Sequence, residues 1–355
     1  MKNNESFFLN GYKHDTVHVV DCQIMLLRDI CSTLGAPISG EMCFGISEGY
    51  SFEYWLDRSS KIPCLIMLGR SLKLAPRFMD KIGIVYNTDT VSTEDEFEKY
   101  TEEKLRANHV PIVFADRYYL RYLEKIYNRA HFGNHVFSIS GMKKENDEVS
   151  YALCDILSDE PVWCSSGEIQ MARNSLWKPF SPDCKVIDVD LNKSNVDKLK
   201  NDLPQMILDS VNNTADFMLT EQKAGVNAIA ALASEVKGLL EADLSKLSRA
   251  LAFQMRLLAS FIREFEETHS FYRMTYAAFL EEASDKYGLG DLMPYSMRIR
   301  EIGKKWTSMS ELIISDEPID ELLNEFSLRL NKTSELERDF FTELKQTIQK
   351  SGLCQ

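Results

Sequence analysis

The sequence has no run of about 18 apolar residues, which is the length that a membrane-spanning helix requires. Residues Met1–Asn10 are polar and then rich in phenylalanine, without the apolar core or the small-residue cleavage site of a secretory signal. These two absences predict a cytoplasmic protein that has no membrane partner.

The sequence has fewer basic than acidic residues. The chain has 41 lysines and arginines against 54 aspartates and glutamates, which gives a formal net charge of −13. A surface that binds nucleic acid needs clustered cations to displace counterions from the phosphates. The composition therefore argues against a nucleic-acid partner.

Common metal and nucleotide motifs are missing too. The chain has 8 cysteines, but no two of them have the Cys-x-x-Cys spacing that is typical of zinc or redox sites. No glycine-rich loop ends in the Gly-Lys-Ser/Thr of a phosphate-binding loop. The sequence therefore predicts neither a metal nor a cofactor, and most cysteines are expected to be small buried hydrophobes.

The chain is too long for one small core, and its character changes near residue 195. Helical and strand-like patterns alternate before that point, whereas long amphipathic stretches dominate after it. The predicted fold class is α+β, with a mixed domain over residues 1–194 and an all-helical domain over residues 195–355. In the first domain we expect helices at 22–34, 94–107 and 116–129, and strands at 64–68, 82–86, 110–114, 135–140 and 149–154. In the second we expect helices near 195–219, 223–241, 243–268, 270–287, 291–313, 317–328 and 332–350.

Cys22 differs from the other cysteines because it opens a predicted helix. Apolar residues recur at helical spacing from Ile24 to Leu34, and Asp21 is suited to be the N-cap. A thiol in the first turn lies beside unpaired N–H groups at the positive end of the helix dipole, which favour a thiolate. Cys22 is therefore the candidate nucleophile, although the charge of Asp21 opposes the thiolate and calls for a nearby cation.

His135 is the candidate for that cation. It opens an apolar strand, and Asp155 ends the strand that follows. If these strands pair antiparallel, the start of one lies beside the end of the other, so that Asp155 can hold the imidazole of His135. The order Cys, His, Asp is that of papain-like enzymes. Each residue alone also fits a structural role, as a core cysteine, a strand-end histidine and a turn-capping aspartate.

Separated segments of the chain resemble the butirosin biosynthesis protein H family. That family has a helix-opening cysteine followed by a glycine and a Phe-Gly…Gly…Phe-x-Tyr run. The matching residues are Cys22, Gly35, Phe44, Gly45, Gly49, Phe52 and Tyr54. The segments similar to its histidine strand, its aspartate strand and its helical second domain are 135–141, 151–155, 271–288 and 304–313.

The resemblance implies a papain-like cysteine protease fold that is used for synthesis, in secondary-metabolite (antibiotic) biosynthesis. Such enzymes, including those of the closthioamide synthetase type, take an acyl group from the phosphopantetheine thioester of an acyl carrier protein. They pass it to a small amine through an acyl-cysteine, and an amide bond forms. Cys22, His135 and Asp155 would then be the catalytic triad. The Cys22 backbone N–H and the side chain of Gln23 are the candidate oxyanion donors.

Two positions depart from the family pattern. Asp21 stands where the family usually has a histidine, and Gly40 separates Ser39 from Glu41, which are adjacent in the usual motif. His18 is a candidate to replace the missing imidazole.

Other functions stay open. With water as the acceptor, the same triad would make a cysteine hydrolase, either a peptidase or a thioesterase. A non-catalytic helical interaction protein is the third interpretation, and the Asp21 departure is its main support. The sequence does not reveal whether the chain self-associates.

A cationic stripe on the helix predicted at 116–129 is either a solvated face or a docking face for an acidic carrier protein. Its members are Arg117, Arg121, Lys125 and Arg129.

Overall fold

In the computed structural model, the described residues are 5–16, 21–57, 64–123, 131–146, 148–178, 180–239, 270–315 and 317–350. The chain forms two compact units. The first comprises Met1–Cys43 and Ala75–Asn201, and the second comprises Phe44–Leu74 and Asp202–Gln355. The boundary expected near residue 195 lies close to the observed change at Asn201. The assignment of residues 44–74 to the second unit is not anticipated by the sequence.

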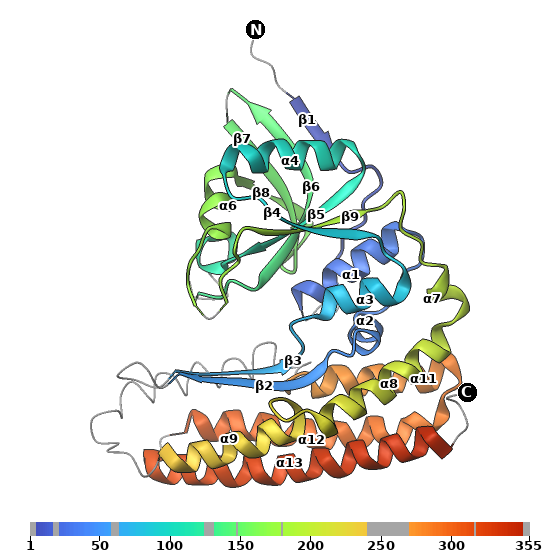
Figure 1. The fold of residues 1–355 in the computed structure, drawn as a ribbon, viewed down its shortest axis with the longest axis vertical. Helices are drawn as coiled ribbons and strands as arrows, with labels where there is room; N and C mark the ends of the chain where they lie inside the picture. The colour runs from blue at the N-terminus through green and yellow to red at the C-terminus, as the bar shows by residue number, and fades with distance from the viewer. Residues whose placement is uncertain are drawn as a thin grey trace. The chain divides into compact units, whose positions relative to one another are not determined.

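The first unit is built around a seven-stranded antiparallel sheet. Its strands are β1 (Glu5–Phe8), β4 (Tyr86–Thr90), β5 (His109–Ala115), β6 (His135–Glu145), β7 (Glu148–Asp155), β8 (Ser158–Ser165) and β9 (Lys185–Asp190). They are ordered β4-β9-β5-β6-β7-β8, and β1 pairs with the later part of β6. Figure 1 shows these strands side by side, with α4 and α6 along them. The predicted antiparallel pairing of the strands that carry His135 and Asp155 is confirmed, since β6 pairs with β7.

The described residues of this unit, wholly or in part, form the helices α1 (Cys22–Thr33), α2 (Gly40–Ile46), α3 (Leu74–Ile82), α4 (Glu94–Arg106), α6 (Ser166–Arg173) and α7 (Asp197–Asn201). The predicted helices at 22–34 and 94–107 are thus confirmed. Helix α4 begins with a capping box of Thr93 and Glu96, carries acidic residues in its first turn and basic residues in its last. This charge order complements the helix dipole.

Two predicted elements of the first unit are wrong. The strand expected at 82–86 begins only at Tyr86 and runs to Thr90, because Ile82 is the buried last residue of α3 and Gly83 ends that helix with φ of +91°. The helix expected at 116–129 is replaced, as far as it is described, by two 3-10 turns at Arg117–Tyr119 (η1) and Arg121–Leu123 (η2). The cationic stripe is therefore not formed as predicted. Arg117 is buried with its guanidinium over the ring of Phe132, and Lys125 and Arg129 lie outside the described residues.

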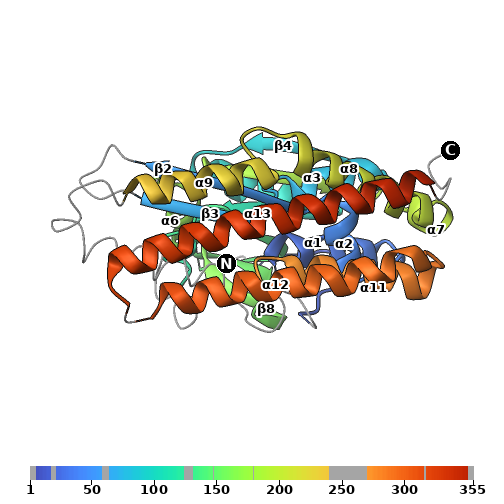
Figure 2. The same cartoon turned by 90° about the horizontal axis from the view of Figure 1, so that it is seen from below.

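The second unit contains helices α8 (Leu203–Thr220), α9 (Gly225–Leu239), α11 (Arg273–Tyr287), α12 (Met293–Ile313) and α13 (Ile319–Lys350), with the hairpin of β2 (Tyr50–Asp57) and β3 (Cys64–Arg70). Figure 2 shows α13 running between α9 and α12, both of which it contacts. The two helices expected at 317–328 and 332–350 are one continuous helix. The helix expected at 243–268 lies outside the described residues.

A buried ion pair joins the elements of the second unit. The guanidinium of Arg273 on α11 meets both carboxylate oxygens of Glu337 on α13 at 2.9 Å, and neither side chain is exposed. The indole N–H of Trp306 on α12 donates to the same carboxylate at 2.8 Å. Phe52 of β2 stacks on Trp306, with ring centroids 5.5 Å apart. The aromatic residues of this hairpin therefore contribute to a core.

Within the described ranges, no helix combines the length and the apolarity needed to traverse a bilayer.

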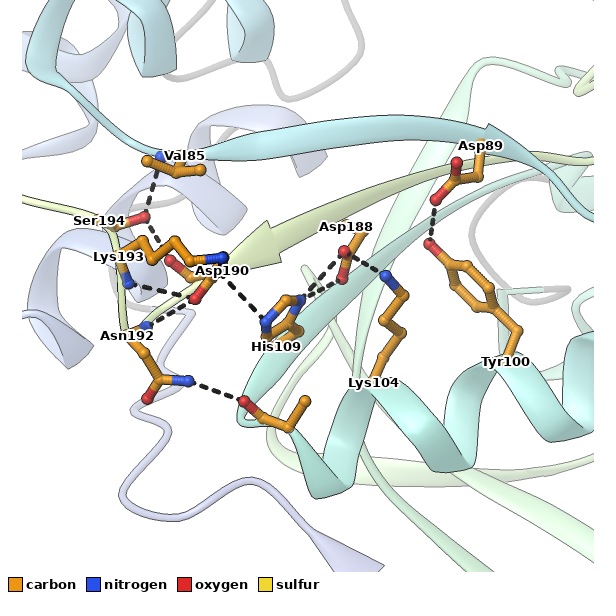
Figure 3. A network of polar contacts seen from close by, with 11 residues as sticks. Val85, Asp89, Tyr100, Lys104, His109, Asp188, Asp190, Asn192, Lys193 and Ser194 are labelled. Atoms are coloured by element: carbon orange, nitrogen blue, oxygen red, sulfur yellow. Dashed lines mark hydrogen bonds and ion pairs between the residues drawn. The ribbon is translucent and has the colours of Figure 1, made fainter.

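A polar network ties β5 to β9 and α4, and is shown in Figure 3. Nδ1 of His109 lies 3.1 Å from both carboxylate oxygens of Asp188, and its Nε2 lies 3.4 Å from Asp190. Lys104 donates to Asp188 at 2.6 Å, and Lys193 lies 3.0 Å from Asp190. Asp188 is fully buried, so its charge depends on these donors.

We expect Asp188→Ala to lower the free energy of unfolding by about 2–4 kcal/mol, because it removes a fully buried carboxylate that accepts from a partly buried imidazole and a partly buried ammonium. Urea denaturation monitored by circular dichroism measures the change. Asp89→Ala, on the neighbouring strand β4, is the matched control. Asp89 is half-buried and accepts one hydrogen bond from Tyr100, so its loss should cost less than about 1 kcal/mol. Equal losses for the two variants would contradict the importance of this network.

Candidate active site

Cys22 is the first residue of helix α1, and its side chain is buried. Asp21 precedes it in an extended conformation. Its Oδ1 accepts the backbone N–H of Gln23 at 2.8 Å and that of Ile24 at 3.3 Å. The Asp21 carboxylate is therefore the N-cap of α1, and the peptide dipoles of the first turn offset its charge. This role explains how an acidic residue is tolerated beside a candidate nucleophile.

The other departure from the family pattern also has a structural role. Ser39 precedes helix α2, and its Oγ accepts the backbone N–H of Met42 at 3.0 Å. Glu41 lies in the first turn of α2, where a negative charge is favourable. His18, the candidate replacement for the missing imidazole, lies outside the described residues.

His135 and Asp155 meet at the paired ends of β6 and β7. Nε2 of His135 lies 2.7 Å from Oδ2 of Asp155, and both side chains are almost fully buried. Oδ1 of Asp155 accepts the backbone N–H of Ile156 at 2.7 Å. Since Nε2 is engaged by Asp155, Nδ1 is the ring nitrogen that remains available, and Cys22 is close enough to contribute to the raised pKa of His135. The structure thus brings together the three residues singled out from the sequence.

The electrostatic surroundings of His135 favour its charged form. Burial alone lowers the pKa of the imidazole, but the charge of Asp155, followed by that of Cys22 and by hydrogen bonds to both, raises it from 6.5 to about 10. A protonated imidazole beside Cys22 is the cation that the negative charge of Asp21 calls for. The arrangement therefore places an imidazolium near the candidate nucleophile.

Only one of the two polar atoms in the buried side-chain amide of Gln23 has a hydrogen-bond partner among the described residues. Its Oε1 accepts the backbone N–H of Ala75 at 3.2 Å, which fixes the orientation of the amide. Nε2 has no hydrogen-bond partner within the described ranges although it is buried. The backbone N–H of Gln23 is taken by Asp21, so the side chain is the group of this residue that can still donate.

Tyr122 is not among the candidate site residues that the sequence predicts. The structure places its hydroxyl 2.6 Å from Oδ2 of Asp155, the oxygen that also contacts His135. No local pattern signals this contact, because 33 residues separate the two partners.

The described residues contain no group of three or more histidine, cysteine, aspartate or glutamate side chains that could hold a metal ion. His14 and His18 have a four-residue spacing that metal sites often use. However, both ring nitrogens of His14 are engaged, Nδ1 by Asp29 at 2.7 Å and Nε2 by the carbonyl of Ser158 at 2.8 Å.

Two family models match the chain. The model of the N-terminal domain of butirosin biosynthesis protein H matches residues 21–155. That match contains Cys22, His135 and Asp155, and it indicates a biosynthesis-associated enzyme family. A model of a domain of unknown function matches residues 168–344. No curated protein matches the chain.

We expect the imidazole of His135 to stay protonated through neutral pH and to lose its proton near pH 10, as measured by ¹⁵N NMR of the histidine rings. Asp155→Asn should lower this pKa, because it removes the neighbouring negative charge. The pKa is higher in the folded protein than in the unfolded chain. Its contribution to stability is therefore complete below about pH 6.5 and is lost as the pH rises through the folded value. His135→Gln assigns the resonance. A ring that titrates near its ordinary value in both proteins would contradict the pairing.

Proposed function

The chain belongs to the butirosin biosynthesis protein H family, and we propose that it is an acyltransferase that forms an amide bond through an acyl-Cys22 intermediate. The observation that carries the proposal is the buried Asp155–His135 hydrogen bond, together with the electrostatic influence of Cys22, at the N-terminus of α1, on the pKa of His135. A thiol at a helix N-terminus with an imidazolium beside it has the surroundings of a nucleophile.

We propose a papain-like fold for the first unit. Support comes from helix α1, which opens with the cysteine and packs against β6 and β7, the antiparallel strands that carry the histidine and the aspartate. The proposed acyl donor is the phosphopantetheine thioester of an acyl carrier protein, and the proposed acceptor is a small amine. Both follow from the family and not from a feature of the site.

The proposed reaction has two steps. The Cys22 thiolate attacks the thioester carbonyl. The tetrahedral intermediate then expels the pantetheine thiolate, which takes its proton from the His135 imidazolium. In the second step the now neutral His135 takes a proton from the attacking amine, and Cys22 leaves as the thiolate. The first step exchanges one thioester for another, and aminolysis of the second is downhill, so neither step requires ATP.

The oxyanion formed in each step needs donors that are already in place. The first N–H groups of a helix have no intrahelical partner, and Cys22 opens α1, so its backbone N–H is one candidate. The unpaired Nε2 of Gln23 is the second, because a buried donor without a partner costs free energy that an oxyanion would offset.

We expect wild-type protein, incubated with a panel of acyl-pantetheine and acyl-carrier thioesters, to gain the mass of one acyl group, and Cys22→Ala to gain none. Intact-protein mass spectrometry measures the gain. Addition of an amine should remove the acyl group faster than water does. Equal rates would support a cysteine hydrolase instead. Failure of every donor, with Cys22 reacting no faster with a thiol probe than the other cysteines, would support a non-catalytic protein.

We expect Gln23→Ala to slow acylation by about 100-fold, the usual effect of removing one oxyanion donor. The rate at which iodoacetamide alkylates Cys22 should be nearly unchanged, because alkylation forms no oxyanion. Gln205→Ala is the control, since this residue lies on the surface of α8 and contacts Asp209. A parallel loss of acylation and alkylation in Gln23→Ala would show that the residue shapes the helix and not the oxyanion site.

A further inference from the structure

Asp155 has one more polar neighbour than a Cys-His-Asp triad requires. Tyr122, in the 3-10 turn η2, directs its hydroxyl to Oδ2 of Asp155 at 2.6 Å. His135 contacts the same oxygen at 2.7 Å. Burial, and after it the negative charge of Asp155, raise the pKa of Tyr122 well above its usual value, so the hydroxyl remains a donor. One carboxylate oxygen is thus shared between an imidazole and a phenol.

The segment before β6 is built to hold Tyr122 in place. Asp116, at its start, accepts the backbone N–H of Tyr118 at 3.2 Å and that of Phe132 at 3.0 Å, which closes the segment on itself. Glu168 of α6 accepts the backbone N–H of Arg121 at 2.9 Å, directly before Tyr122. The direction of the Tyr122 side chain is therefore set by contacts on both sides of the turn.

Sharing Oδ2 has a chemical consequence. Each donor withdraws part of the negative charge of a carboxylate, and a hydrogen bond to a charged group is stronger than one between neutral groups. The hydrogen bond from Tyr122 thus weakens the electrostatic attraction between the carboxylate of Asp155 and the protonated ring of His135. A histidine that must both give and take a proton works best when its pKa is not far above the operating pH.

We propose that Tyr122 is a positioning residue of this site: its hydroxyl fixes Oδ2 of Asp155 toward His135 and keeps part of the carboxylate charge from the imidazole. This inference rests on the proposed function for its role in catalysis. In the acyl-enzyme Cys22 carries no charge, so Asp155 and its partners decide how readily His135 becomes the neutral base that the amine needs.

Other titratable groups also face this carboxylate and its partners. They act on Tyr122, His135 or Asp155 in the folded protein, and they are Cys22 on α1, His14, Cys154 on β7, Cys164 on β8 and Glu168 on α6. All of them remain in place in Tyr122→Phe, which removes a hydroxyl and keeps the ring. A change in the pH dependence of this variant therefore reports on the hydroxyl.

The test compares Tyr122→Phe with wild type in two measurements. The first is the rate of Cys22 alkylation by iodoacetamide as a function of pH, whose upper inflection reports the loss of the imidazolium proton. It should move up by about one pH unit in the variant, because a hydrogen bond to a charged group has about that value. The second is single-turnover mass spectrometry at pH 7.5. Removal of the acyl group by amine should slow by about 3- to 10-fold, while acylation stays within about twofold.

Two further variants define the outcome. Tyr119→Phe removes a hydroxyl from the neighbouring 3-10 turn and should leave both measurements unchanged. In an Asp155→Asn background, adding Tyr122→Phe should cause no further shift, because the hydroxyl acts through the carboxylate. An unshifted inflection in Tyr122→Phe, or equal slowing of acylation and acyl removal, would overturn the inference. The alkylation profile needs no acyl donor, so it decides on Tyr122 even if no thioester acylates the protein and the proposed function fails.

Discussion

The charge of Asp155 is the constraint on which the candidate site depends. A carboxylate that is almost fully buried is costly unless each of its oxygens is hydrogen-bonded. Here the donors come from three places: the imidazole at the start of β6, the hydroxyl of Tyr122 in η2 and the backbone of Ile156. Satisfying this single group therefore requires the pairing of β6 with β7 and the folding of the turns before β6. The arrangement of His135 follows from the same requirement.

Two aspartates flank the candidate chemistry, and their surroundings give them different roles. Asp21 caps the helix, because its oxygen accepts two backbone N–H groups of the first turn of α1. Asp155 instead faces an imidazole and stabilises its positive charge. The negative charge beside Cys22 is thus neutralised locally, while the one behind His135 acts on the ring. Replacement of the family's usual histidine by Asp21 is therefore compatible with a reactive thiol.

The parts of the structure that could be predicted are those fixed by local pattern. The start of α1 follows from Asp21 and the apolar period behind it, and the β6–β7 pairing follows from two apolar runs joined by a short polar turn. The parts that could not be predicted depend on distant contacts. The turns at 117–123 replace a helix because Asp116 binds Phe132 and Ser175, which no helical period reveals. The division expected between residues 328 and 332 is wrong, because Arg329–Asn331 contains neither proline nor glycine and α13 continues through it.

In the described part of the first unit, four histidines pair with aspartates, and their remaining contacts distinguish the structural pairs from the candidate catalytic pair. His109 is held at both nitrogens by Asp188 and Asp190, and His14 by Asp29 and a backbone carbonyl. A ring engaged in this way has no nitrogen left to move a proton to a substrate.

His131 is held at Nδ1 by Asp116, and its ring is stacked between Tyr118 and Trp177, with centroids 4.0 and 4.2 Å away. The nearby hydroxyl of Ser175 binds Asp116 and not the ring, so it is not activated as a nucleophile. His135 differs because Nε2 is fixed by a buried carboxylate, while the thiol whose charge raises the pKa of the ring lies at a helix N-terminus. Proton transfer needs this combination of one anchored and one reactive nitrogen. Within the described part of the first unit, it is this combination, and not the presence of an Asp–His pair, that identifies the candidate site.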